Sequence, residues 1–505
     1  MSAPTLERTA SASSSWNARR WTQPVVLGLA VFLTRLPGLV TDRLFNTDEA
    51  TLSVGGRELA DGGSLYVGVI DRKPPLPFLL YATFGGGDLR PVRVVIALSI
   101  FVAALVVASE ARRRWGARAG WAAGLVLVLG ASALGPMDAQ AANFELFALL
   151  PIVVAVVAAA RGRAVLAGVA LAVAVLCKQP AAVTIVPVAW CWWQTRRWRG
   201  VLGGLAAGAV AALVLTFPFK LSRVMEWALL GTGGYLSMDP SDIGYSLLRL
   251  LYLVLLAAGF WGGAWLLAVA PRVGPAVDPD PVVEPGAALV VRGDAVDVWL
   301  LLGVSCLGVV AGFRFFPHYL VQLLPALALL AGRGAAVARP VVRRAALVWG
   351  LGASVVAAAL GWHMGLDPKP AYPRDMAAYA RAHTDGGDEI LVWGNVPEVY
   401  WRADRQPAGG FTHTEFITDY SGGRRAHAAS EQDVPDVELY RAWIRRLHLD
   451  PPTLVFDTAA ADLRGGRYFP LSRFPEVTKL LDERYERVAT VDGVPVYRLV
   501  DPGSR

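Results

Sequence analysis

Two adjacent carboxylates, Asp48 and Glu49, follow closely after the first long apolar stretch of the sequence. Like charges this close repel each other, and partial burial raises the pKa of at least one of them. A carboxylate in this setting can act as a general base on a hydroxyl group or bind a divalent cation. It can also be structural, with Asp48 capping a helix and Glu49 lying in the first turn. Both uses can hold together.

Positive charge appears further along the same loop, in the run Asp71-Arg72-Lys73-Pro74-Pro75. The prolines forbid a helix and stiffen the backbone. Arg72 and Lys73 can therefore hold a lipid phosphate by charge and hydrogen bonds. Alternatively, the two side chains anchor the loop at the membrane interface by snorkelling.

A later apolar stretch begins with the polar residues Asn143 and Glu145. Ionisable groups at or near membrane depth are energetically unfavourable and need a reason. Glu145 can join Asp48 around a metal ion or an acceptor, with Asn143 as a neighbouring candidate. Alternatively, the charge of Glu145 interacts favourably with a helix N-terminus.

Three more cationic candidates stand at the ends of apolar stretches. Lys178 precedes Gln179-Pro180 and is either a phosphate partner or a snorkelling group. Arg314 and His318 flank a short aromatic turn and can stabilise a leaving phosphate, with Tyr319 beside them as a further candidate for acceptor or metal contact. Alternatively, His318 only fills the aromatic belt of the interface.

The elements that must position these residues are apolar. More than half of the 505 residues are hydrophobic and 18% are charged, against about 25% in soluble domains. A hydrocarbon core about 30 Å thick needs roughly 20 apolar residues in a helix. We therefore expect an α-helical polytopic membrane protein with about eleven transmembrane helices, at 23–40, 92–109, 119–135, 144–160, 164–180, 181–194, 201–217, 246–270, 297–315, 319–337 and 343–360.

Arginine clusters indicate the orientation. Runs such as Arg112-Arg113-Arg114 recur on one side of the apolar stretches, as is typical of cytoplasmic loops. The net charge of +7 is spread over such short clusters and forms no basic groove, which disfavours nucleic-acid binding. The expected regions are a cytoplasmic tail at 1–22, a transmembrane domain of the cell membrane at 23–360 with an extracytoplasmic loop at 41–91, and an extracytoplasmic domain at 361–505.

Shorter elements are expected outside the spans. The first loop should contain an amphipathic helix over Ala50–Ala60 and an apolar one over Pro77–Phe84. In the tail, helical and strand patterns alternate, which predicts a small soluble α/β domain. Its expected helices are Arg374–His383, Asp436–Leu447 and Glu476–Tyr485, and its expected strands are Glu389–Trp393, Thr453–Phe456, Glu486–Val491 and Val494–Leu499.

Taken together, these segments resemble the lipid-linked-sugar glycosyltransferases of the GT-C superfamily, and most of all the branch of protein O-mannosyltransferases and lipid A aminoarabinose transferases. The resemblance covers roughly residues 25–335, whereas the tail does not resemble the MIR domain of eukaryotic protein mannosyltransferases. It rests on Thr47-Asp48-Glu49-Ala50, the run from Arg57 to Tyr66, the run from Asp71 to Leu76, Phe84-Gly85, Arg93, Asn143-Phe144-Glu145, Lys178-Gln179-Pro180 and Phe316-Pro317-His318-Tyr319.

The resemblance implies a polyprenyl-phosphate sugar donor, an inverting mechanism and a site at the outer membrane surface. Asp48 matches the acidic residue of the family's first loop and would be the base that takes the acceptor's proton. Phosphate is a good leaving group, so the site needs charge stabilisation more than a general acid. Glu49 and Glu145 would position the acceptor or share a divalent cation, since some relatives use a metal and others do not. The residues that would supply the positive charge are Arg72, Lys73, Lys178, Arg314 and His318.

Several alternatives stay open. The acceptor is a cell-envelope glycan, a lipid or a protein, and the protein acceptor is put in doubt by the missing MIR domain. A lipid-linked-sugar transporter or flippase would show inverted repeats and broken helices at mid-membrane, and no repeat is evident in the sequence. A non-catalytic envelope assembly protein with a degenerate site is the third reading. No Walker A loop, Rossmann fingerprint or zinc-ligand spacing is present, which disfavours nucleotide-dependent chemistry.

Overall fold

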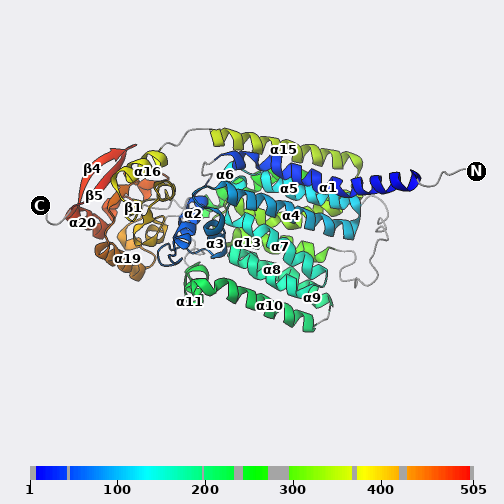
Figure 1. Cartoon of the computed structure of the whole chain (residues 1–505), viewed down its shortest axis with the longest axis horizontal. Coiled ribbons are helices and arrows are strands. Elements are labelled where there is room, and N and C mark those ends of the chain that lie inside the picture. The colour runs from blue at the N-terminus through cyan, green and yellow to red at the C-terminus, as the bar shows by residue number, and fades with distance from the viewer. Residues whose placement is uncertain are drawn as a thin grey trace, which may run out of the picture.

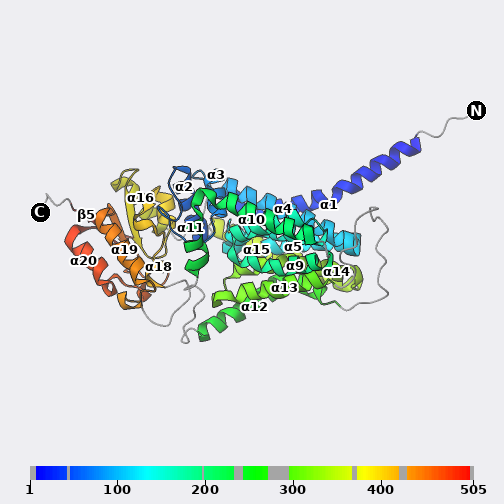
Figure 2. The same ribbon diagram turned by 90° about the horizontal axis from the view of Figure 1, so that it is seen from below.

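The computed structural model describes seven stretches of the chain: 7–41, 46–195, 198–232, 243–270, 295–366, 372–419 and 429–500. Parts of the expected N-terminal tail, first loop and C-terminal domain (1–6, 42–45 and 501–505) therefore lie outside the described residues. Figure 1 shows a bundle of long helices with an α/β unit at one end. The N-terminal part of α1 extends beyond the opposite end of the bundle (Figure 2).

Each of the eleven apolar stretches predicted from the sequence overlaps an apolar helix. These helices are α1 (Glu7–Val40), α4 (Arg90–Trp115), α5 (Ala117–Ser132), α7 (Phe144–Ala160), α8 (Ala164–Cys177), α9 (Ile185–Thr195), α10 (Trp198–Thr216), α12 (Ile243–Ala268), α13 (Val296–Val310), α14 (Leu324–Val337) and α15 (Pro340–Leu366). In the described part of the chain, seven helical segments are long and apolar enough to cross a membrane, and α5, α7 and α8 are shorter apolar helices. The predicted fold class, a polytopic helical membrane protein, is confirmed.

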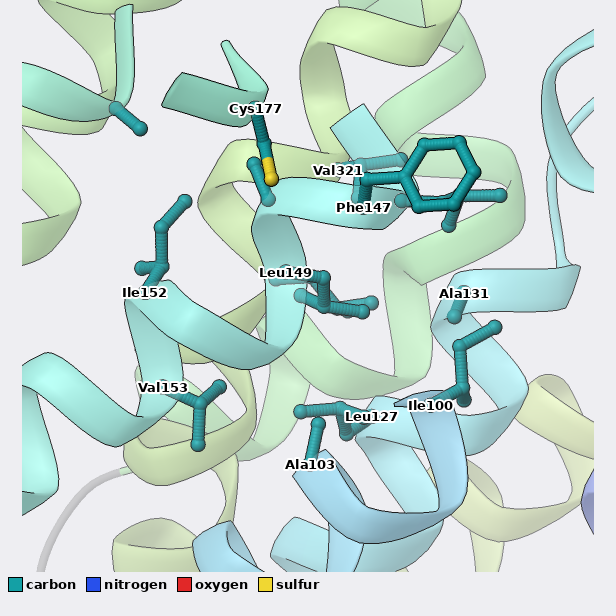
Figure 3. Packing of buried hydrophobic residues seen from close by; sticks show 14 of the residues in the cluster. Ile100, Ala103, Leu127, Ala131, Phe147, Leu149, Ile152, Val153, Cys177 and Val321 are labelled. Atoms are coloured by element: carbon teal, nitrogen blue, oxygen red, sulfur yellow. The ribbon is translucent and has the colours of Figure 1, made fainter. Parts of the chain in front are cut away.

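Close packing holds the bundle together. Figure 3 shows Ile100 of α4 and Leu127 of α5 in the same buried cluster as Phe147 and Ile152 of α7. In lipid no hydrophobic effect drives helices together, so their association depends on close packing. Small residues at the contact allow the two backbones to approach closely. A Cβ at Gly168 of α8 would collide with the backbone of Gly204 in α10, so this helix pair depends on glycine.

Short helices connect the bundle to the α/β unit. The first loop contains α2 (Thr47–Ala60) and α3 (Leu76–Phe84), close to the helices predicted at Ala50–Ala60 and Pro77–Phe84. The prediction began α2 too late because Asn46 caps it, its side chain accepting a hydrogen bond from the Glu49 amide at 3.0 Å. Two further short helices are α6 (Pro136–Ala139) and α11 (Leu221–Val224).

The C-terminal unit is a five-stranded sheet in the order β2-β1-β3-β5-β4, with β1 parallel to β2 and β3 and with β5 antiparallel to β3 and β4. Its strands are β1 (Glu389–Trp393), β2 (Gln406–Pro407), β3 (Leu454–Asp457), β4 (Tyr485–Val491) and β5 (Val494–Leu499). Its helices are α16 (Tyr372–His383), α17 (Glu398–Ala403), α18 (Glu415–Thr418), α19 (Val437–Leu449) and α20 (Pro475–Arg484). The small α/β domain expected at the C-terminus is therefore present.

Alternating side chains of β1 divide the core of this domain. Ile390 and Val392 pack with α16 and α17, whereas Leu391 and Trp393 pack with α19 and α20. This is the period-2 alternation of a sheet that is covered on both faces. Val54 of α2 belongs to the same core cluster as α16 and α17, so the first loop is built into the C-terminal domain.

Polar contacts reinforce that docking. Arg57 of α2 forms an ion pair with Asp404 at 2.6 Å and donates to the carbonyl oxygens of Tyr400 and Arg405. The Ile70 amide donates to the carbonyl of Gly410 at 2.8 Å. The C-terminal domain is therefore fixed above the end of the bundle where α2 and α3 lie (Figure 1).

Candidate functional site

Asp48 and Lys73 form the central pair of the candidate site. The Lys73 ammonium donates to Asp48 Oδ1 at 3.1 Å and lies 3.7 Å from Asp71 Oδ2. The Lys73 backbone is held in turn, since its amide donates to Asp71 Oδ1 and its carbonyl accepts from the Tyr66 hydroxyl at 2.8 Å. The first turn of α2 and the proline-stiffened run after Asp71 thus bring the two charges together.

The electrostatics of this pair keep both groups ionised. Burial raises the pKa of Asp48, but the charges of Lys73, His318 and Lys178 outweigh it and hold that pKa well below the usual range. Burial lowers the pKa of Lys73, and the carboxylates of Asp48, Asp71 and Glu415 overcome it and raise the pKa. Asp48 is therefore a carboxylate at neutral pH, and Lys73 is an ammonium.

Glu49 points away from this pair into the protein. Its side chain is fully buried and forms a bidentate ion pair with Arg93. The distances are 2.9 Å from Nε to Oε1 and 2.8 Å from Nη2 to Oε2. The Ala142 amide also donates to Oε1 at 2.8 Å. Arg93 also donates hydrogen bonds to the carbonyl oxygens of Gly38 and Thr41. This network ties α2 to α1, α4 and the start of α7.

A second cationic cluster surrounds Glu145 at the start of α7. Lys178 Nζ lies 2.8 Å from Glu145 Oε1 and His318 Nε2 lies 3.9 Å from the same oxygen. The other ring nitrogen of His318 is 2.8 Å from Asp138 Oδ1. Three segments that are far apart in the sequence, around residues 138–145, Lys178 and His318, therefore meet here.

The two clusters share one aromatic ring. The Phe144 ring centroid is 4.9 Å from Lys73 Nζ and 5.4 Å from Lys178 Nζ. Tyr319 also contacts Lys178, with its ring centroid 5.2 Å from Nζ. Asp48, Lys73, Glu145, Lys178 and His318 thus form one site, as the sequence led us to expect of residues on one face.

Other candidates occupy different places. Asn143 is fully buried and caps α7, accepting from the Leu146 amide at 3.2 Å and donating to the Asp138 carbonyl at 2.9 Å. Its amide group is therefore engaged in local structure and does not face the site. Arg72 is directed to the C-terminal domain, where NH1 lies 4.0 Å from Glu415 Oε1. The charge of the buried Arg314 also acts on Glu415 and contributes to its lowered pKa.

The two carboxylates that the sequence suggested as metal ligands, Asp48 and Glu145, are paired with lysines. Within the described residues, no group of three or more histidine, cysteine, aspartate or glutamate side chains is placed to hold a metal ion. The two ammonium groups place positive charge directly beside these carboxylates.

Sequence reasoning missed the contribution of the C-terminal domain. His413 is buried and Glu415 is half-buried near Arg72 and Lys73, more than three hundred residues further along the chain. Asp138 was also not proposed as a partner of His318. No local motif marks these residues, because only the docking of the domain brings them to the site.

Comparisons with known proteins bear on the fold. No protein-family model matches the chain, and no curated protein sequence matches it. Among solved structures, ArnT from Cupriavidus metallidurans bound to undecaprenyl phosphate matches over 95% of this chain and 98% of its own, with a TM-score of 0.57 and 18% identity. The apo form of that protein matches with a TM-score of 0.56.

An oligosaccharyltransferase from Archaeoglobus fulgidus, tethered with an acceptor peptide, matches over 96% of this chain and 75% of its own, with a TM-score of 0.54 and 12% identity. The same enzyme has been solved in complex with Zn and sulfate, and that structure has a TM-score of 0.52. These likenesses show that the chain has the GT-C fold, and its own apolar helices are those of a multi-pass membrane protein. Within that fold it is similar to ArnT over nearly its whole length.

Proposed function

We propose that the protein is a membrane glycosyltransferase that moves a sugar from a polyprenyl-phosphate donor to an extracytoplasmic acceptor. The observation that carries the proposal is the site in which Asp48 lies among Lys73, Lys178 and His318, at the end of a bundle with the GT-C fold. One structural neighbour, ArnT, binds undecaprenyl phosphate. A similar lipid phosphate in this chain would find the positive charge that it needs.

In the proposed reaction Asp48 is the general base. It takes the proton of an acceptor hydroxyl, whose oxygen forms a bond to the anomeric carbon while the bond from that carbon to the phosphate oxygen breaks. The phosphate leaves with the electron pair, and attack from the opposite face inverts the anomeric configuration. Lys73, Lys178 and His318 stabilise the negative charge that develops on the phosphate.

Donor binding would also strengthen the base. The low pKa of Asp48 keeps it ionised but makes it a weak proton acceptor. When a donor phosphate binds Lys73, part of the lysine's charge is neutralised and the pKa of Asp48 rises towards its ordinary range. The base therefore becomes effective only when the leaving group is in place.

Glu49 has a different part in this proposal. Both oxygens of its carboxylate are engaged by Arg93 and the Ala142 amide. We therefore assign it the positioning of Asp48, and not proton transfer. Arg72 and Arg314 contribute positive charge from the side of the C-terminal domain, and the proposal includes no metal step.

The membrane orientation completes the proposal. Residues 1–22 are cytoplasmic, residues 23–360 cross the cell membrane, and the loop 41–91 and domain 361–505 face the extracytoplasmic side. The acceptor is a cell-envelope glycan, a lipid or a protein. Because the site lies between the bundle and the C-terminal domain, the donor enters from the lipid and the acceptor from outside.

The base assignment can be tested with Asp48→Asn and Asp48→Ala in purified protein supplied with synthetic polyprenyl-phosphate sugars. Loss of a general base lowers the rate by about 10²–10⁴-fold, while the folded fraction stays that of the parent chain. The matched control is Glu58→Gln, which removes a carboxylate from the same helix away from Lys73. Undiminished transfer in both Asp48 variants would exclude Asp48 as the base.

A further inference from the structure

The segment Phe411–Glu415 of the C-terminal domain is rigidly held against the site. The Ile70 amide donates to the Gly410 carbonyl, and the two hydroxyl oxygens of Thr51 and Thr412 lie 3.4 Å apart. Gly410 has φ of +88°, and a Cβ there would lie 3.1 Å from the Val67 carbonyl oxygen. This close approach of two backbones requires glycine.

Aromatic stacking fixes the side chains of this segment. The Phe416 ring stacks on Phe411 at 4.8 Å and on His413 at 5.2 Å between centroids. The Arg72 guanidinium lies 4.5 Å from the Phe416 centroid, and Trp227 contacts both phenylalanines edge-on. The imidazole of His413 therefore has one defined orientation at the boundary between the domain and the bundle.

Polar atoms at this boundary lack partners. His413 Nδ1 and Asp71 Oδ2 are both buried and have no hydrogen-bond partner among the described residues. The carboxylate of Glu415 lies 3.9 Å from His413 Nδ1 and 4.0 Å from Arg72 NH1, both beyond hydrogen-bond distance. Buried polar atoms normally form hydrogen bonds, so each buried atom without one needs an explanation. A ligand with several hydroxyl groups would provide one.

Asp71 links these atoms to the catalytic pair, because its Oδ2 lies 3.7 Å from Lys73 Nζ. The charges of Asp71, Lys73 and Arg72 all act on the His413 ring. Burial lowers the pKa of His413 against the opposing charge of Glu415, so the ring is neutral and offers one donor and one acceptor. A neutral imidazole beside carboxylates suits sugar hydroxyl groups, each of which also donates and accepts.

We infer that His413 and Glu415, with Asp71, form the subsite that recognises the hydroxyl groups of the donor's sugar, so that the C-terminal domain determines which sugar is transferred. The inference rests on the proposed function and deepens it. Lys73 and Lys178 would hold the phosphate on the bundle side, and the domain would hold the sugar on the other side. The anomeric carbon between them would then lie close to Asp48.

The inference can be tested by binding measurements on the full chain in vesicles. The probes are undecaprenyl phosphate alone and a panel of undecaprenyl-phosphate hexoses and pentoses. His413→Phe keeps the stacking on Phe416 but removes both ring nitrogens, and Glu415→Gln keeps the shape but removes the charge. The control is His383→Phe, since His383 is an exposed histidine of the same domain.

We expect His413→Phe and Glu415→Gln to weaken binding of the preferred sugar conjugate by about tenfold, with unchanged affinity for undecaprenyl phosphate. Unchanged affinities for both probes would overturn the inference and leave the proposed function standing. Equal losses for both probes would show that these residues support the fold or the phosphate site, which also overturns it. If the parent chain binds no sugar conjugate better than undecaprenyl phosphate, the proposed function and the inference both fail.

Discussion

Replacing Glu49 by glutamine should mainly lower the stability of the protein, whereas replacing the neighbouring Asp48 should mainly lower its transfer rate. The substitution keeps the shape of the side chain but removes the charge that faces Arg93. Arg93 and Arg35 are both 1% exposed, and the charge of Glu49 acts on Arg35 as well. The variant would therefore leave two buried guanidinium groups without their shared counter-ion.

The expected loss of stability is large. Breaking a buried ion pair by removing one partner costs about 3–5 kcal/mol, and the Glu49–Arg93 pair has two short contacts of 2.8 and 2.9 Å. The presence of Arg35 places the expected value in the upper half of that range. Asp48→Asn, by contrast, removes a charge whose side chain is 18% exposed and leaves Lys73 beside Asp71, so it should lower stability less than Glu49→Gln.

The assay is reversible unfolding in mixed micelles by titration with sodium dodecyl sulfate, for the parent chain, Glu49→Gln, Asp48→Asn and the control Glu58→Gln. Glu49→Gln should lower the free energy of unfolding while transfer per folded molecule falls less than in Asp48→Asn. If Glu49→Gln unfolds like the control and abolishes transfer, Glu49 takes part in the chemistry and our separation of the roles is wrong.

Three further outcomes follow from the site. Lys73→Met should raise the pKa of Asp48, because the opposing charge is lost. The fall of kcat/KM at acidic pH should then begin at a higher pH than in the parent chain. An unchanged pH–rate profile would contradict the pairing of Asp48 with Lys73. Saturating EDTA should leave the transfer rate unchanged, since lysines supply the positive charge; inhibition that is reversed by added metal would refute this. Leu449→Cys, at an 87% exposed position of α19, should react with an impermeant maleimide in intact cells when Cys306 is replaced by serine. Labelling only after lysis would reverse the proposed orientation.

The sequence predicted the elements better than it predicted the partners. The apolar stretches and the strands at Glu389–Trp393 and Val494–Leu499 coincide with helices and strands of the structure, because periodicity and length are local properties. Strand β2, of two residues, and helix α17 were missed because such short segments carry little pattern.

Side-chain roles were harder to predict, because they depend on contacts between distant segments. Glu49 resembles Asp48 in the sequence, and their different partners, Arg93 for Glu49 and Lys73 for Asp48, separate their roles in the structure. Asn143 was proposed as a neighbour of an acceptor or metal, and the structure adds that its side chain caps α7. The contribution of His413 depends on how the C-terminal domain docks, which no local spacing shows.

The way in which the first loop is built into the C-terminal domain has a consequence for exchanging parts between relatives. Val54 lies in the domain's own core, and Arg57 holds three of its backbone or side-chain groups. A chimera joined at the end of α15 would combine the C-terminal domain of a relative with the first loop of this chain, and the two surfaces would not match. The unit that can be transplanted is discontinuous: the domain together with α2 and the strand-like run to Ile70. Selection for a new specificity would have to alter both pieces of the gene in concert.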